Sequence, residues 1–131
     1  MSEERVRPAP AQRFATDCLT FNLHSEIAAL RAEPTPARHG HRQKTLFKHA
    51  TRTLALFVLD AGATLPEHAA GGTMTVLVLE GEVDMMVAGT PHHLRSGDLL
   101  VTPPGVRHDV RTSGPAAFLL QVSLEAPRSE S

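Results

Sequence analysis

The sequence contains no tryptophan, no tyrosine and only one cysteine, and each shortage excludes a class of site. Cys18 alone can form no disulfide within the chain, nor can it complete a zinc site of two or four thiolates. Five phenylalanines stand beside no tryptophan or tyrosine, so the chain has little aromatic surface on which nucleic acid bases could stack. Its 13 Lys and Arg residues against 14 Asp and Glu residues leave no positive surplus for binding phosphates. We therefore expect no nucleic-acid partner.

Long hydrophobic runs are missing as well. The longest wholly apolar stretch covers residues 54–59, whereas a membrane-spanning helix needs roughly 18 apolar residues. Residues 1–14 are charged and rich in proline, which is unlike a secretory signal peptide. The sequence therefore predicts a soluble cytoplasmic protein without a membrane partner.

The remaining composition is that of one globular domain. The chain has 131 residues, of which 41 % are hydrophobic and 21 % charged. A chain of this length buries roughly two thirds of its unfolded surface when it folds. We expect a flexible N-terminal arm over residues 1–19, a single domain over residues 20–125 and a flexible tail over residues 126–131.

Only one segment has the periodicity of a helix. Leu23, Ile27 and Leu30 are spaced so that they share one face, and Asn22 is placed to cap the start. Pro34 follows closely and cannot continue a helix. The pattern predicts a helix over about residues 22–32.

The chain after this helix is divided into short apolar runs with glycine or proline at nearly every break. The runs cover residues 53–59, 74–79, 83–87, 99–102 and 116–124. Short strands at this spacing are typical of an all-β sandwich or barrel, here over about residues 44–124.

Two stretches of the chain carry a longer pattern of glycine, proline and histidine. Its matching positions are Gly62, His68, Gly81, Gly97, Pro103, Gly105 and His108. In spacing they resemble the two signature motifs of the cupin superfamily, G-x5-H-x-H-x3,4-E-x6-G and G-x5-P-x-G-x2-H-x3-N. The resemblance covers about residues 20–124 and is closest to small single-domain bacterial cupins. It implies a double-stranded β-helix (jelly-roll) barrel with a short N-terminal helix, and a homodimer.

The chain departs from the metal-binding version of these motifs. In that version the first motif supplies two His and one Glu, and the second supplies one His. Here His68 and His108 match, but Ala70 stands at the second His position and Met74 at the Glu position. Thr112 replaces the final Asn, which is a milder change. Two imidazoles alone hold a divalent ion weakly, since a catalytic site generally has three protein ligands. We therefore expect a degenerate metal site.

Other histidines could in principle replace the missing ligands. His92 and His93 precede the Gly97 turn, and one of them should face inward if both lie in a strand. His39 and His41 have a His-x-His spacing, but the neighbouring prolines favour an exposed loop. The remaining two, His24 and His49, carry no motif and are expected at the surface.

Alternation along the strands predicts what lines the barrel. Met74, Val76 and Val78 should share the inward face of one strand. Val83, Met85 and Val87 should do the same on the next strand, with Glu82 and Asp84 opposite. These walls would enclose either a cavity for a small, partly apolar ligand or a filled core.

One stretch of the chain is locally basic. Between residues 34 and 59 there are five cations and no carboxylate: Arg38, Arg42, Lys44, Lys48 and Arg52. The run fits either a solvated strand pair at an edge or a rim that attracts anions.

Three functional hypotheses follow. In the first, the barrel binds a small organic molecule without a firmly held metal, with His68, His108, Met74 and Met85 as contacts and the two imidazoles available for acid–base chemistry. In the second, His68, His108 and one of His92 or His93 hold Fe, Mn, Zn, Ni or Cu in a dioxygenase or isomerase. In the third, the protein is a non-catalytic sensor or accessory dimer.

Overall fold

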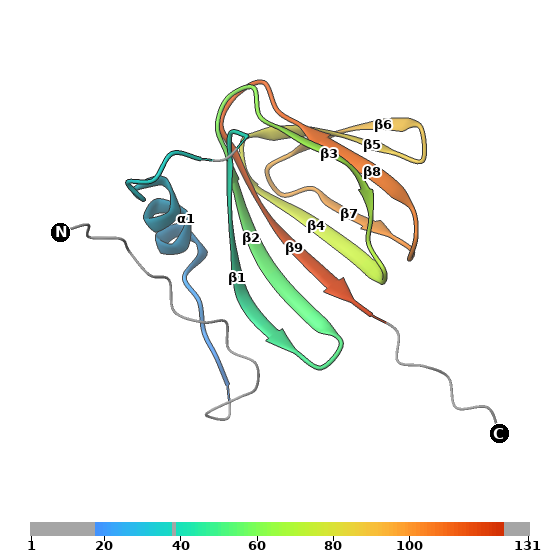
Figure 1. The fold of residues 1–131 in the computed structure, drawn as a ribbon, viewed down its shortest axis with the longest axis horizontal. Helices are drawn as coiled ribbons and strands as arrows, with labels where there is room; N and C mark the ends of the chain where they lie inside the picture. Colours follow the sequence, from blue (N-terminus) through green and yellow to red (C-terminus); the bar gives the residue numbers. More distant parts are fainter. Residues whose placement is uncertain (1–17, 38, 125–131) are drawn as a thin grey trace.

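The computed structural model describes residues 18–37 and 39–124 (Figure 1). One short helix, α1 (Leu23–Arg31), precedes the strands. In chain order the strands are β1 (His41–His49), β2 (Arg52–Leu59), β3 (Thr64–Ala69), β4 (Thr73–Glu80), β5 (Glu82–Val87), β6 (Thr90–Arg95), β7 (Leu99–Thr102), β8 (Arg107–Arg111) and β9 (Ala116–Ser123). Most of the expected arm and the whole expected tail lie outside the described residues.

The strands form two antiparallel sheets that face each other (Figure 1). One sheet has the order β1-β2-β9-β4-β7 and the other the order β3-β8-β5-β6. Apart from the hairpins β1–β2 and β5–β6, the neighbours in each sheet are not consecutive in sequence, which is the connectivity of a jelly roll. The predicted all-β barrel with a short N-terminal helix is therefore confirmed. Within the described residues, no helix is long and apolar enough to span a membrane.

The helix lies on the outer face of the larger sheet, beside β1 and β2 (Figure 1). Its start is capped as predicted, because the backbone N–H of Ser25 donates to the Asn22 side chain over 2.9 Å. Ile27 and Leu30 are buried against Leu56 and Val58 of β2. The helix thus closes a second small core outside the barrel, while the interior of the barrel stays available for the site.

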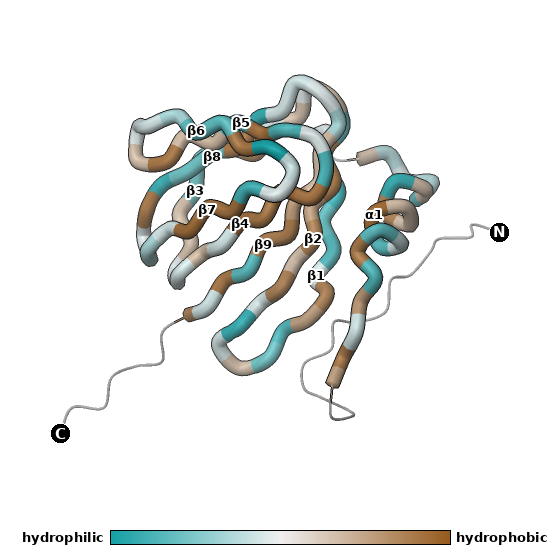
Figure 2. Tube along the Cα trace, turned by 180° about the vertical axis from the view of Figure 1, so that it is seen from behind, coloured by the Kyte–Doolittle hydropathy of each residue, from teal (hydrophilic) through white to brown (hydrophobic). Residues whose placement is uncertain are grey.

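The barrel interior follows the predicted alternation. Met74, Val76 and Val78 are at most 1 % exposed, and Val83 and Met85 of β5 are buried in the same cluster. Figure 2 shows hydrophobic and hydrophilic residues alternating along the strands. Glu82 and Asp84, on the opposite face of β5, are exposed, also as predicted.

Four strands were not marked by apolar runs in the sequence: β1, β3, β6 and β8. All four carry charged or histidine side chains. Three of them, β1, β3 and β6, are edge strands, with one neighbour each in their sheets. Edge strands commonly carry polar side chains, which blunt their unpaired backbone. Because no apolar run marks β1, its start could not be placed accurately from the sequence. The barrel begins at His41, three residues before the predicted start.

Candidate functional site

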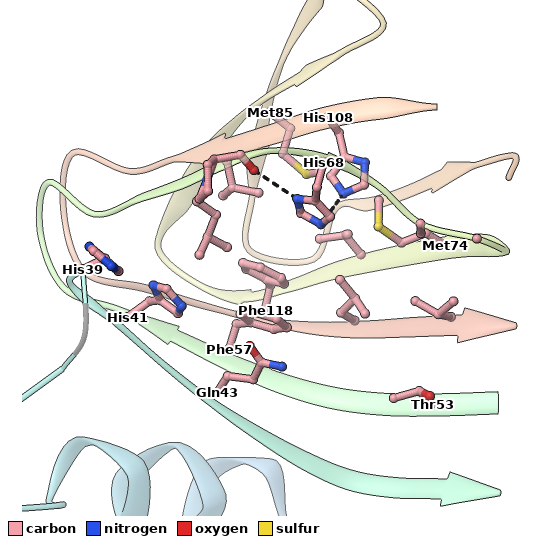
Figure 3. A pocket seen from close by; sticks show the side chains of 18 of the residues that line it. His39, His41, Gln43, Thr53, Phe57, His68, Met74, Met85, His108 and Phe118 are labelled. Carbon is pink, nitrogen blue, oxygen red and sulfur yellow. Dashed lines mark hydrogen bonds between the residues drawn. The ribbon is translucent and has the colours of Figure 1, made fainter. Parts of the chain in front are cut away.

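A cavity of about 620 Å³ lies between the two sheets. Its inner walls are apolar and come from β4, β5, β8 and β9, including Val76, Met85, Val110 and Phe118. His68 and His108 project into it from the smaller sheet (Figure 3). The sequence left open whether this space is filled or hollow, and the structure has a cavity of ligand size.

The two motif histidines meet inside this cavity. His68 of β3 and His108 of β8 are register partners, although 40 residues separate them in sequence. Their Nε2 atoms are 3.0 Å apart (Figure 3). His108 is only 2 % exposed, whereas His68 is exposed. The two histidines at the matching motif positions thus converge on one point of the cavity.

Backbone carbonyls fix the orientation of both rings. Nδ1 of His68 lies 3.0 Å from the carbonyl oxygen of Pro66, and Nδ1 of His108 lies 3.1 Å from that of Val106. A carbonyl oxygen can only accept, so each Nδ1 carries the ring proton and donates it. In two neutral rings both Nε2 atoms would then present lone pairs to each other. The Nε2 contact becomes a hydrogen bond only when one further proton lies between them.

The surroundings of His108 disfavour its charged form. Burial lowers the pKa of His108, and the neighbouring His68 imidazole lowers it further. These effects outweigh the Val106 carbonyl and Asp109, which raise the same pKa. The buried ring of the pair is therefore held toward its neutral form.

A stacked aromatic pair on the larger sheet also lines the cavity. The rings of Phe57 and Phe118 are stacked with their centroids 4.9 Å apart and an angle of 8° between their planes. Both side chains line the cavity (Figure 3). An aromatic ligand ring can pack against the edges of such a pair, or against a ring face that the stack leaves uncovered.

The exposed-loop expectation holds for His39 but not for His41. His39 lies in an exposed turn, whereas His41 is half-buried at the start of β1, and both residues line the end of the cavity away from Met74 (Figure 3). Burial and the nearby His39 ring lower the pKa of His41, outweighing the opposing effect of the His39 backbone. Its Nδ1 is buried, with no hydrogen-bond partner of ordinary geometry among the described residues. The neighbouring prolines favoured a loop at His41, but they all lie before the first residue of β1.

The basic run is divided between the two faces of β1. Lys44 pairs with Glu26 of the helix over 2.7 Å, and Arg42 lies 3.6 Å from Glu33. Lys48, by contrast, lines the cavity. Arg38 falls outside the described residues. The solvated-edge interpretation therefore fits Arg42 and Lys44, and the anion-rim interpretation fits Lys48.

Residues 55–122 match the family model of the cupin domain. The chain belongs to the cupin family. Among solved structures, this cupin is similar to a conserved protein of unknown function from Streptococcus pyogenes, with a TM-score of 0.70, 17 % identity, and 92 % of this chain covered against 100 % of that one. It is also similar to a cupin superfamily protein from Desulfitobacterium hafniense, with a TM-score of 0.64, 21 % identity and coverage of 70 % and 84 %. A third similar structure is salicylate 1,2-dioxygenase from Pseudoaminobacter salicylatoxidans, with a TM-score of 0.62, 20 % identity and coverage of 76 % and 30 %. A comparison with curated proteins found no match.

The donor set of this cupin does not fit a firmly held divalent ion. Ala70 and Met74 both line the cavity, so the two positions without a ligand are at the site itself. Ala70 offers no donor, and Met74 offers only a soft thioether, which suits Cu(I) better than Fe(II). Among the described residues, no group of three His, Cys, Asp or Glu side chains is arranged to hold a metal.

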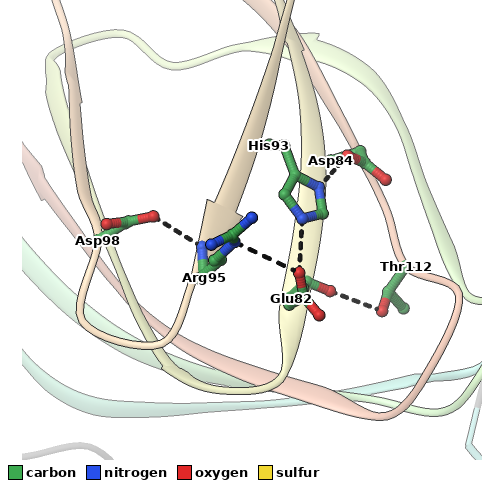
Figure 4. A network of polar contacts seen from close by, with 6 residues as sticks. All are labelled: Glu82, Asp84, His93, Arg95, Asp98 and Thr112. Carbon is green, nitrogen blue, oxygen red and sulfur yellow. Dashed lines mark hydrogen bonds and ion pairs between the residues drawn. The ribbon is translucent and has the colours of Figure 1, made fainter.

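Neither histidine of β6 reaches the cavity of this cupin. His92 lies opposite the inward-facing Met85 in the register but is itself exposed, because β6 is the edge strand. His93 points outward, where Nδ1 lies 2.7 Å from Asp84 and Nε2 lies 2.6 Å from Glu82 (Figure 4). Both residues are thus displaced from the third-ligand role that the sequence left open to them.

Thr112, at the place of the family asparagine, has a structural contact instead. Its hydroxyl donates to the backbone carbonyl of Glu82 over 3.0 Å (Figure 4). The side chain is buried at the end of β8, so it ties the strand ends together.

The outward His93 cluster predicts a pH-dependent contribution to stability. Hydrogen bonds to Asp84 and then Glu82 raise the pKa of His93 above its usual 6.5. Its stabilising effect is therefore fully present below pH 6.5 and is lost as the pH rises through the raised value. His93→Gln should lower the melting temperature relative to wild type at pH 6, and the difference should shrink by pH 9.

His92→Gln is the matched control, because His92 lies beside His93 and has no such ion pair among the described residues. An equal and pH-independent effect of both variants would contradict the assignment.

Proposed function

We propose that this cupin binds a small, largely apolar organic molecule in the barrel cavity, without a firmly held metal. His68 and His108 would supply the polar contact, and Met74 and Met85 the apolar contact. The proposal rests above all on one observation: a cavity of about 620 Å³ with apolar walls contains a converging imidazole pair whose Nε2 atoms are 3.0 Å apart.

The pair would act on the ligand by giving or taking one proton. Because both Nδ1 atoms are committed to carbonyls, only the Nε2 side is available for exchange. An imidazole is suited to this task near neutral pH. A ligand that carries a hydrogen-bonding group would take the place of one imidazole in the contact between the two Nε2 atoms and would bind Nε2 of the other.

The similar structures support an organic ligand but do not specify it. The salicylate 1,2-dioxygenase structure is a complex with gentisate, a small aromatic molecule. The metal-dependent alternative would need a third ligand, and His92 and His93 lie outside the cavity. We therefore favour ligand binding over metal chemistry.

The proposal also includes the expected cytoplasmic location and the expected homodimer. Sedimentation equilibrium would test the homodimer by measuring the mass of the protein in solution.

Methionine methyl NMR tests the proposal directly. Met74 and Met85 line the cavity, whereas Met86 is 37 % exposed and is not part of its lining. Titration of ¹³C-methyl-methionine protein with a library of small organic molecules, in the presence of a chelator, should identify compounds that shift Met74 and Met85 but leave Met86 unchanged.

Two alanines give a matched pair of variants for this experiment. Ala70→Phe places a ring in the cavity and should abolish the shifts, whereas Ala69→Phe adds the same ring at an exposed neighbouring position and should preserve them. A library without a single hit, or hits that all require added metal, would contradict the proposal.

A further inference from the structure

The charge of the cavity wall is one-sided. Among the described residues that line it, Lys48 is a permanent cation and His39, His41, His68 and His108 are imidazoles, and none is Asp or Glu. The remainder of the lining is mainly apolar. A low-polarity cavity bordered by a cation favours a ligand with the opposite charge.

A β-bulge explains why this lysine belongs to the cavity. Lys44, Leu46 and Lys48 alternate in sequence and would all point outward in a regular strand. The pairing of β1 with β2 shifts between Thr45 and Phe47, however, which moves the following residues to the other face. Leu46 is thus buried under the helix on the outside, while Lys48 lies opposite Thr53 on the cavity side.

The two lysines of the strand differ in their partners as well as in their direction. The Lys44 ammonium is 2.7 Å from the Glu26 carboxylate on the helix. Lys48 has no ion pair with any residue that the structure describes. Its charge therefore remains available to a molecule that enters the cavity.

We infer that the ligand is an aromatic monocarboxylate, with its carboxylate near Lys48 and its ring against Phe57 and Phe118. This inference rests on the proposed function and names its ligand class. A single free lysine matches one negative charge, and the apolar walls disfavour a more highly charged molecule. The stacked phenylalanines, 4.9 Å between centroids, offer the ligand ring aromatic edges and the ring faces that the stack leaves uncovered.

The test compares 2-naphthoate with its neutral amide, 2-naphthamide, by isothermal titration at low salt. The wild type should bind the carboxylate more tightly than the amide. Lys48→Met should weaken 2-naphthoate binding about five-fold, the size of an exposed ion pair, and leave 2-naphthamide unchanged. Added salt should weaken 2-naphthoate binding to the wild type more than to this variant.

Lys44→Met is the matched control, since it removes the same charge from the outer face of the same strand. It should leave the affinity for both probes unchanged. Equal binding of the two probes, with no effect of Lys48→Met, would overturn the charge selection while leaving the proposed function intact. Failure of both probes would overturn the aromatic carboxylate, and the methionine NMR library would then decide the proposed function separately.

Discussion

Replacing Gly81 with alanine should lower the free energy of unfolding by about 3 kcal/mol or more, one of the largest single-residue effects that we expect. Gly81 joins β4 to β5 with a φ of 72°, in the left-handed region that costs other residues conformational energy. A Cβ there would also clash with the carbonyl oxygen of Pro115 and would lie 3.1 Å from Cα of Ala116. Backbone atoms of β9 and its approach cannot move aside without disturbing the sheet.

Gly105 provides the control, because it shares the backbone conformation without the crowding. Its φ is 81°, and a Cβ would meet nothing within 4 Å. Gly105→Ala should therefore cost about 1–2 kcal/mol, from backbone strain alone. Urea unfolding followed by circular dichroism measures both, since the chain has no Trp for fluorescence. Equal losses in the two variants would contradict the close approach of Pro115 to Gly81.

The double substitution Ala70→His with Met74→Glu should create a metal site that the wild type lacks. Both positions line the cavity together with His68 and His108, so the variant would present three imidazoles and a carboxylate to one point. This is the donor type that holds divalent iron, manganese or zinc. We expect uptake of about one ion per chain, and a rise in melting temperature when metal is added.

The rise on metal addition has a specific cause. Met74 is 1 % exposed, so an unpaired glutamate in its place is unfavourable until a cation neutralises it. Ala69→His with Met86→Glu introduces the same side chains at exposed positions away from the cavity and should bind no more metal than wild type. If the cavity variant takes up no more metal than this control, the four positions do not converge.

Much of the fold could be predicted because alternation and turn chemistry are local. Met74, Val76 and Val78 repeat every second residue, and a buried strand face requires this period. The positive φ at Gly81 and Gly105 could also be predicted from the sequence, since glycines at strand breaks commonly adopt it.

The first strand could not be predicted in the same way. His41, Gln43 and Lys48 on its inner side are as polar as Arg42 and Lys44 on its outer side, so no hydrophobic period marks it. The bulge after Thr45 has no signature in the sequence either. Regular alternation along the strand, which takes no account of the bulge, places the Lys48 side chain on the wrong face of β1.

The histidine pair could be predicted from the sequence only in part. Pairing of β3 with β8 brings His68 and His108 together, and only the likeness to the cupin motifs indicated this from sequence. Their tautomers depend on carbonyls two residues earlier, at Pro66 and Val106, which needs the actual ring orientation. Similarly, alternation gives the face of His92 but not the exposure of its edge strand.

The central claim is that the imidazole pair serves an organic ligand rather than a metal ion. Its most direct test is metal analysis by mass spectrometry of tag-free protein, equilibrated with Fe, Mn, Zn, Ni and Cu and compared with the His68→Ala variant. We expect far less than one ion per chain, with no difference between the two proteins. About one ion per wild-type chain, lost in His68→Ala, would contradict the claim.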